Sequence, residues 1–133
     1  MDLNKSYTET DPTLEKDGVE VNLGDGAAII VRPMRNENFR KYLNELLKPY
    51  ERRIQQKRMD GKLQDELTRK AVAKFVLIGW KGIKLDGKEV KYSPEKAVEL
   101  MERFGDFEED VLTAAMTRET FRAEVVEENE KNS

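Results

Sequence analysis

The stretch LTRKAVAKFVLIGWKGIKLDGKEVKYSPE, residues 67–95, contains the longest nearly unbroken apolar run of the chain and its single tryptophan. Apolar residues spaced four apart from Leu63 to Phe75 lie on one face of a helix. The β-branched residues at the end of the run would also suit a strand. Because the amphipathic lead-in is long and unbroken, we expect a buried helix that ends at Gly79 or Gly82.

A tight polar loop and a new helix start follow this run. Asp86-Gly87 is a turn signal, and its flanks are long enough for a miniature hairpin. In Ser93-Pro94-Glu95, the serine is a good N-cap, the proline suits the first helical position, and the glutamate complements the helix dipole. The helix that begins there should end at Gly105 as its C-cap, and the next helix should begin at Asp106.

A hairpin and a kinked helix are expected before the central stretch. Val19–Leu23 alternates apolar and polar residues, Ala27–Val31 is apolar, and a Gly-Asp-Gly turn joins them. This pattern predicts a β-hairpin, which must dock on another element because a lone hairpin is marginal in water. An amphipathic stripe then runs from Phe39 to Ile54, and Pro49 inside it should kink the helix.

These elements predict a mainly α fold of the α+β class, in which an N-terminal β-hairpin packs on a bundle of four to five helices. The length of 133 residues suits one domain. We expect a flexible N-terminal segment at residues 1–17, a single α+β domain at 18–126 and an acidic flexible tail at 127–133.

Composition excludes several classes of function. The chain has 24 basic and 27 acidic side chains, and this balance argues against a general nucleic-acid binder. It contains neither cysteine nor histidine, which excludes Cys/His zinc sites, cysteine nucleophiles and histidine triads and fits a reducing compartment. No apolar run approaches the roughly 20 residues of a membrane span. We expect a cytoplasmic protein that is not an enzyme and has no metal or cofactor.

Several apolar side chains are candidates for a surface that binds a partner. One strand is apolar on both faces, the kinked stripe is widened near the proline, and an isolated aromatic residue lies on an otherwise acidic last helix. Tryptophan is enriched among residues that dominate binding energy, although a core position is the alternative. The candidate partner-binding residues are Trp80, Ile30, Leu47, Phe121 and Val125.

The densest basic run of the chain consists of Arg52, Arg53, Lys57 and Arg58. These cations are not interleaved with aromatic residues, so a solvated face or an acidic partner is favoured over phosphate contacts. The alternative is a small phage or bacterial regulator that binds DNA through the Arg52–Arg58 face.

The order of the motifs resembles the tail assembly chaperones of long-tailed (siphovirus-type) bacteriophages. The resemblance covers most of residues 18–132 and rests on the hairpin Val19–Gly26, on Asn38-Phe39 and Lys48-Pro49, on Trp80-Lys81-Gly82-Ile83, Asp86-Gly87 and Tyr92–Glu95, and on Phe121–Glu124. It implies a helical protein in the cytoplasm of the host bacterium that coats the tape measure protein, keeps it soluble and helps to recruit tail tube protein. It also implies a longer form made by translational frameshifting.

A structural subunit of a phage head or tail is a third reading, and self-association is left open. Presence in the finished virion would separate a subunit from a chaperone. A salt-dependent gel shift would identify a DNA-binding regulator, because phosphate contacts weaken steeply as salt rises.

Overall fold

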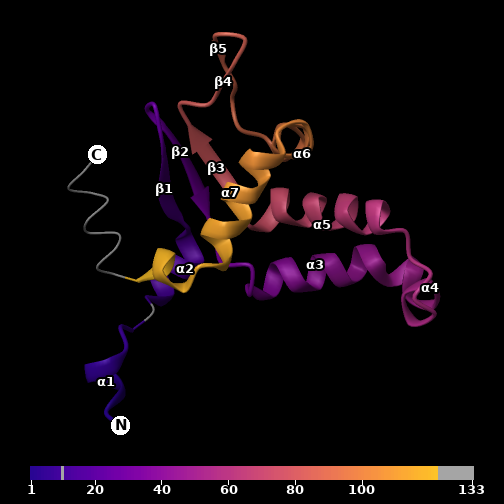
Figure 1. Ribbon diagram of the computed structural model, residues 1–133, viewed down its shortest axis with the longest axis horizontal. Helices are drawn as coiled ribbons and strands as arrows, with labels where there is room; N and C mark the ends of the chain where they lie inside the picture. The colour runs from indigo at the N-terminus through magenta and orange to yellow at the C-terminus, as the bar shows by residue number, and fades with distance from the viewer. Residues whose placement is uncertain (10, 123–133) are drawn as a thin grey trace.

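A small antiparallel sheet lies in the middle of the molecule (Figure 1). The computed structural model describes residues 1–9 and 11–122. The strands are β1 (Val19–Gly24), β2 (Ala27–Val31) and β3 (Leu77–Lys81), in the order β1-β2-β3. The pairing of β1 with β2 confirms the predicted hairpin, and β2 is the central strand.

The third strand corrects the predicted fold class. The helix α5 (Gly61–Phe75) stops before the apolar run ends, and the residues from Leu77 onward pair with β2 instead of continuing the helix. The β-branched residues Val76 and Ile78 favour this outcome, because they fit a pleated surface better than a helix. The hairpin is therefore part of a three-stranded sheet, and the expected hairpin on a helical bundle is wrong.

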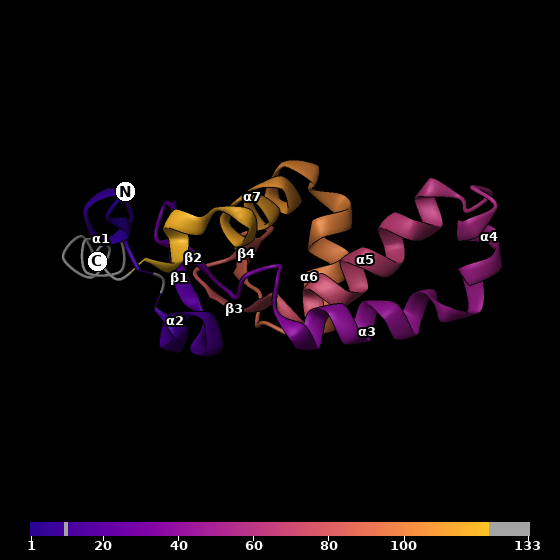
Figure 2. The same cartoon turned by 90° about the horizontal axis from the view of Figure 1, so that it is seen from below.

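One face of the sheet carries the core. Ile29 and Val31 of β2 are fully buried, and their cross-strand neighbours on β3 are Trp80 and Leu77. The helix α7 (Gly105–Met116) contacts β2 while α5 contacts β3, so these two helices cover the buried face (Figures 1 and 2). Across the opposite face, Lys81 of β3 pairs with Glu20 of β1.

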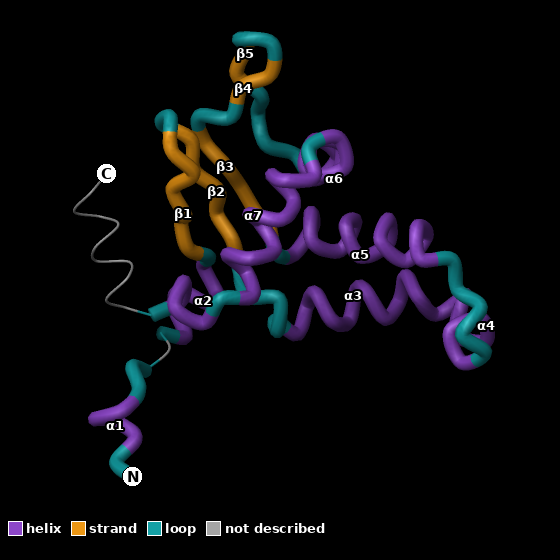
Figure 3. Tube along the Cα trace, viewed as in Figure 1, coloured by secondary structure: helices purple, strands orange, loops and turns teal. Residues whose placement is uncertain are grey.

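A helical arm projects away from the sheet (Figures 1 and 3). It consists of α3 (Glu37–Leu47), the short 3₁₀ turn η1 (Lys48–Tyr50), α4 (Glu51–Gln55) and α5, and α3 lies beside α5. Pro49 lies in the 3₁₀ turn, so the predicted kink is a complete break between α3 and α4.

The base of the arm is closed by hydrogen bonds. The backbone N–H of Arg32 donates to the carbonyl oxygen of Val76 at 2.8 Å, which joins the points where the chain leaves and rejoins the sheet. The Asn36 side chain accepts from the N–H of Phe39 at 2.7 Å, as expected of an N-cap, and donates to the carbonyl of Phe75 at 3.1 Å. One asparagine therefore caps α3 and also holds the end of α5.

The C-terminal part adds a miniature hairpin and two helices. The miniature hairpin, which the sequence left open, forms between β4 (Lys84–Leu85) and β5 (Lys88–Glu89). The predicted Ser93 cap of α6 (Pro94–Arg103) is confirmed. The predicted C-cap at Gly105 is wrong, because Gly105 is the first residue of α7, which has no side-chain cap. The turn η2 (Arg118–Phe121) follows α7.

The N-terminal segment contains α1 (Leu3–Ser6) and α2 (Pro12–Asp17). Leu14 of α2 packs against the core, and its neighbour Glu15 pairs with Arg35. Part of residues 1–17 is therefore tied to the body. The predicted acidic tail at residues 127–133 lies outside the described residues.

Candidate partner-binding grooves

The arm and the first turns of α6 enclose a groove of about 480 Å³, which we call the arm groove. Three of its residues, Glu66, Lys70 and Lys74, recur every four positions along α5 and form a ridge about 12 Å long. Tyr42 of α3 lines the groove with them. The other wall is the start of α6, with Pro94 and Glu95.

The floor of the arm groove is apolar, with the part-buried Tyr42 and Val98, and its rim is charged. The ring of Tyr42 meets that of Phe75 edge to face at 5.4 Å, and the ammonium group of Lys74 lies 4.4 Å from the centroid of the Tyr42 ring. Because Glu66 and Glu95 lie on the rim as well as Lys70, the rim offers both signs of charge. An apolar floor with a mixed rim suits an amphipathic helix.

A second groove of about 360 Å³ lies between the miniature hairpin and the corner where α6 meets α7, and we call it the corner groove. Its most exposed aromatic side chain is Phe104, at 44%. The groove is lined by Ala27, Gly82, Ile83, Lys84, Leu85, Leu100, Phe104 and Phe107.

An ordered aromatic cluster lies next to the corner groove. The indole N–H of Trp80 donates to the Val90 carbonyl at 2.7 Å, and its ring stacks edge to face on Tyr92 and Phe107. The Tyr92 hydroxyl bonds to the Leu77 carbonyl at 2.6 Å. Burial, together with the charge of a nearby glutamate, raises the pKa of Tyr92 to about 12. This cluster fixes the wall that Phe107 contributes to the groove.

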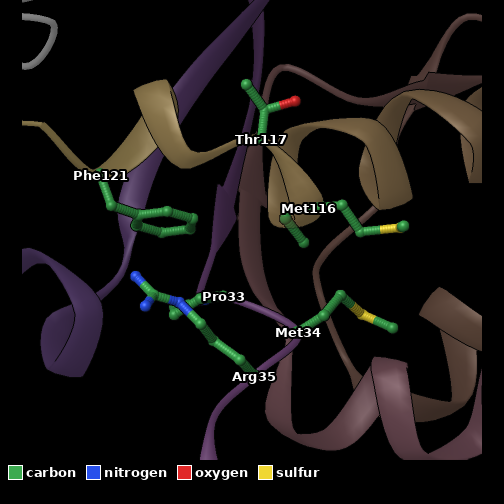
Figure 4. A pocket seen from close by; sticks show the side chains of 7 residues that line it. Pro33, Met34, Arg35, Met116, Thr117 and Phe121 are labelled. Atoms are coloured by element: carbon green, nitrogen blue, oxygen red, sulfur yellow. The ribbon is translucent and has the colours of Figure 1, made fainter.

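A smaller pocket of about 200 Å³ lies between the base of the arm and the end of α7. Figure 4 shows Met34 and Met116 on one side and the ring of Phe121 on the other. Arg35, which also lines it, is engaged by Glu15. The pocket is therefore closed in part by an ion pair between α2 and the segment after β2.

A fourth hollow of about 160 Å³ contains a partly buried ion pair between α5 and α7. The Nε atom of Arg69 lies 2.5 Å from Oε2 of Glu108, and the two side chains are 14% and 25% exposed. The hydrogen bond that Arg69 donates to Glu108 raises the pKa of Arg69, against the opposing effect of burial. The pair fastens the arm to the C-terminal helices.

The structure places the predicted partner-binding residues in different parts of the molecule. Trp80, at 9% exposed, and Phe121, at 1%, belong to the core. Ile30 is half-buried on the open face of the sheet, and Leu47 is half-buried at the end of α3. Val125 lies outside the described residues. These side chains form no common surface within the described part, and their role in binding stays a prediction.

The sequence did not predict the two grooves. Nothing in the sequence pattern singles out Tyr42, which lines the arm groove, or Phe104, which lines the corner groove. The basic residues Arg52–Arg58 are exposed at the far end of the arm.

No group of three or more acidic side chains converges as a metal site in residues 1–9 and 11–122. Within the same residues, no helix is long and apolar enough to cross a membrane.

Comparison with known proteins gives one family. The family model described as YdaY prophage protein matches residues 34–132, a span that includes the whole arm, β3 and every helix after it. No curated protein and no solved structure matches the chain.

Proposed function

This chain belongs to the YdaY prophage protein family, and we propose that it is a tail assembly chaperone that holds a helical segment of the tape measure protein in the arm groove. In this proposal it also helps to recruit tail tube protein while the tail is built. The observation that carries the proposal is the shape of the arm groove, an open channel with an apolar floor between two helical walls.

The dimensions and chemistry of the arm groove fit a helical client. Its ridge on α5 spans about two helical turns, which matches a short amphipathic segment with one apolar stripe. The floor supplies apolar contact through Tyr42 and Val98, and the charged rim stays in water. Contact of this kind is reversible, because it uses few side chains and no covalent chemistry.

The segments that carry the resemblance to tail assembly chaperones also line the two grooves. Gly82 and Ile83 belong to the corner groove, and Pro94 and Glu95 belong to the arm groove. Part of the sequence resemblance therefore lies on the concave surface. Membership in a prophage family is consistent with this proposal.

The proposal is tested by co-expression with the tape measure protein encoded by the same prophage. We expect the wild-type chain to increase the soluble fraction of that protein and the groove variant Val98→Glu to lose most of this effect, because a carboxylate on the apolar floor would need to be desolvated. The matched control is Thr113→Glu, which adds the same charge at an exposed position on α7.

Melting temperatures of the purified variants show whether Val98→Glu folds. If it does not, the double variant Lys70→Glu/Lys74→Glu changes only exposed rim residues and replaces it. The proposal is wrong if the tape measure protein is equally soluble without the chain. It is also wrong if folded groove variants protect it as well as the wild type does. Finding the chain in purified virions by mass spectrometry would make it a structural subunit.

A further inference from the structure

The far end of the arm is a concentrated basic surface, which we call the arm tip and define as residues 48–62. It carries six basic side chains against two acidic ones, a formal charge of +4. Because the whole chain has a formal charge of −3, the other residues together carry −7. The charge of the molecule is therefore strongly separated along its length.

The cations of the arm tip are available to a partner. In the described part of the chain, the ion pairs within 4.0 Å involve none of them. The guanidinium of Arg53 lies 5.7 Å from the centroid of the Tyr50 ring, and Arg58 donates to Gln56 at 3.1 Å. Ile54 is 40% exposed among these charges. An apolar centre with an arginine-rich rim is typical of a protein interface.

The corner groove has the complementary character. Its lining is apolar, and Phe104 leaves 44% of its surface in water. The adjoining residues 102–110 carry five acidic side chains against one arginine, a formal charge of −4. Four of the acids, Glu102, Asp106, Glu109 and Asp110, are exposed. The corner groove therefore combines an apolar contact with negative charge, whereas the arm tip combines an apolar contact with positive charge.

We propose that the arm tip of one copy docks on the corner groove of a second copy, with Ile54 against Phe104 and the cations of the tip facing the acids of residues 102–110. Figures 1 and 2 show α4 at the far end of the arm and the α6–α7 corner on the body, so the contact joins two molecules. Each copy carries both surfaces and can bind two neighbours or one reciprocal partner.

A second copy explains the arm tip better than a nucleic acid does. Phosphate contacts would use the arginines and lysines but would leave Ile54 exposed in the centre of the surface. The corner groove, at about 360 Å³, has room for an aliphatic side chain and the edge of the helix that bears it. The inference uses neither the arm groove nor the tape measure protein, so it stands or fails independently of the proposed function.

The test is sedimentation velocity on the purified full chain over a range of concentrations. We expect the mean mass to rise with concentration in about 0.1 M salt, where charges act over about 10 Å, and to fall towards the monomer in about 1 M salt, where they act over about 3 Å. The tip variant Arg52→Glu/Arg53→Glu and the corner variant Glu102→Lys/Asp106→Lys should each remain monomeric alone. The control Lys5→Glu/Lys16→Glu, which changes the net charge as the tip variant does, should associate like the wild type.

Mixing the two variants is the decisive measurement. The acidic tip of one then faces the basic corner of the other, and the unaltered surfaces still match, so the equimolar mixture should regain association. Melting temperatures exclude unfolding, and Ile54→Ser should weaken association without changing any charge. A monomeric wild type overturns the inference, and so does a mixture that stays monomeric. A gel shift of duplex DNA that the tip variant loses, together with a monomeric wild type, would assign the tip to nucleic acid.

Discussion

Replacement of Gly82 by alanine tests how closely the end of β3 is packed against the β1–β2 turn. Gly82 has a φ of +69°, a conformation that alanine rarely adopts. An added Cβ atom would lie 2.2 Å from the carbonyl oxygen of Gly26 and 3.1 Å from the Cα atom of Ala27. Both are backbone atoms, so no side-chain rotation relieves the contact.

The expected cost has two parts. A left-handed backbone at a residue with a Cβ costs about 1–2 kcal/mol, and forcing an extra carbon into a packed site costs about 1–3 kcal/mol more. The free energy of unfolding should therefore fall by about 2–5 kcal/mol. At about 4 °C per kcal/mol for a chain of this size, the melting temperature should fall by about 8–20 °C.

Two matched glycine variants separate these parts in urea and thermal unfolding followed by circular dichroism. Gly26→Ala has a φ of +77° but open space around the new carbon, so it should cost only the backbone part, about 1–2 kcal/mol. Gly61→Ala has open space and no positive φ and should be neutral or stabilising by up to about 1 kcal/mol. If Gly82→Ala proves as stable as Gly26→Ala, the turn does not press on Gly82 and the reasoning is refuted.

Three further predictions concern the aromatic cluster and the partly buried ion pair. Trp80→Ala should lower the free energy of unfolding by about 3–5 kcal/mol, as loss of a buried aromatic side chain does. Trp80→Phe should lower it by about 1–3 kcal/mol, because the Val90 carbonyl loses its hydrogen-bond donor. Urea unfolding measures both, and an unchanged midpoint for Trp80→Ala would place Trp80 at the surface. The folded chain favours the neutral phenol of Tyr92, whose pKa is raised from 10.0 to about 12, so this contribution to stability is complete below pH 10 and is lost as pH rises to about 12. Tyr92→Phe should therefore lose less stability over that range, and parallel alkaline melting curves for the two proteins would contradict this. Glu108→Gln removes the charge that faces Arg69 and should lower the free energy of unfolding by about 1–3 kcal/mol at pH 7. The exposed Glu109→Gln is the control. Equal urea-unfolding midpoints for the two variants would show that the ion pair contributes nothing to stability.

The parts of the fold that could be predicted from sequence are those fixed by neighbouring residues. The β1–β2 hairpin follows from an alternating strand, a Gly-Asp-Gly turn and an apolar strand, and the cap at Ser93 follows from local side-chain chemistry. The apolar run after Phe75 has no such local determinant. Its residues suit both a helix and a strand, and the decision comes from β2, which offers an unpaired edge far away in the sequence.

The grooves could not be predicted for a related reason. Tyr42 and Val98 lie on different helices, and only the packing of α3 and α6 against α5 brings them to one channel. The exposure of Phe104 depends likewise on where the α6–α7 corner falls. By contrast, the basic run Arg52–Arg58 was recognised directly, because charge density is a property of the sequence itself.

The hydrogen bond between Arg32 and Val76 has a consequence for how this protein can diversify. The arm between these two residues leaves and re-enters the sheet at one point. If one helical turn were added after Leu47 at the end of α3 and another before Gly61 at the start of α5, the arm would become about 5.4 Å longer. Such an insertion would leave the pairing of the strands unchanged. The length of the arm can therefore change by the gain or loss of a few codons, while the sheet and its core stay the same.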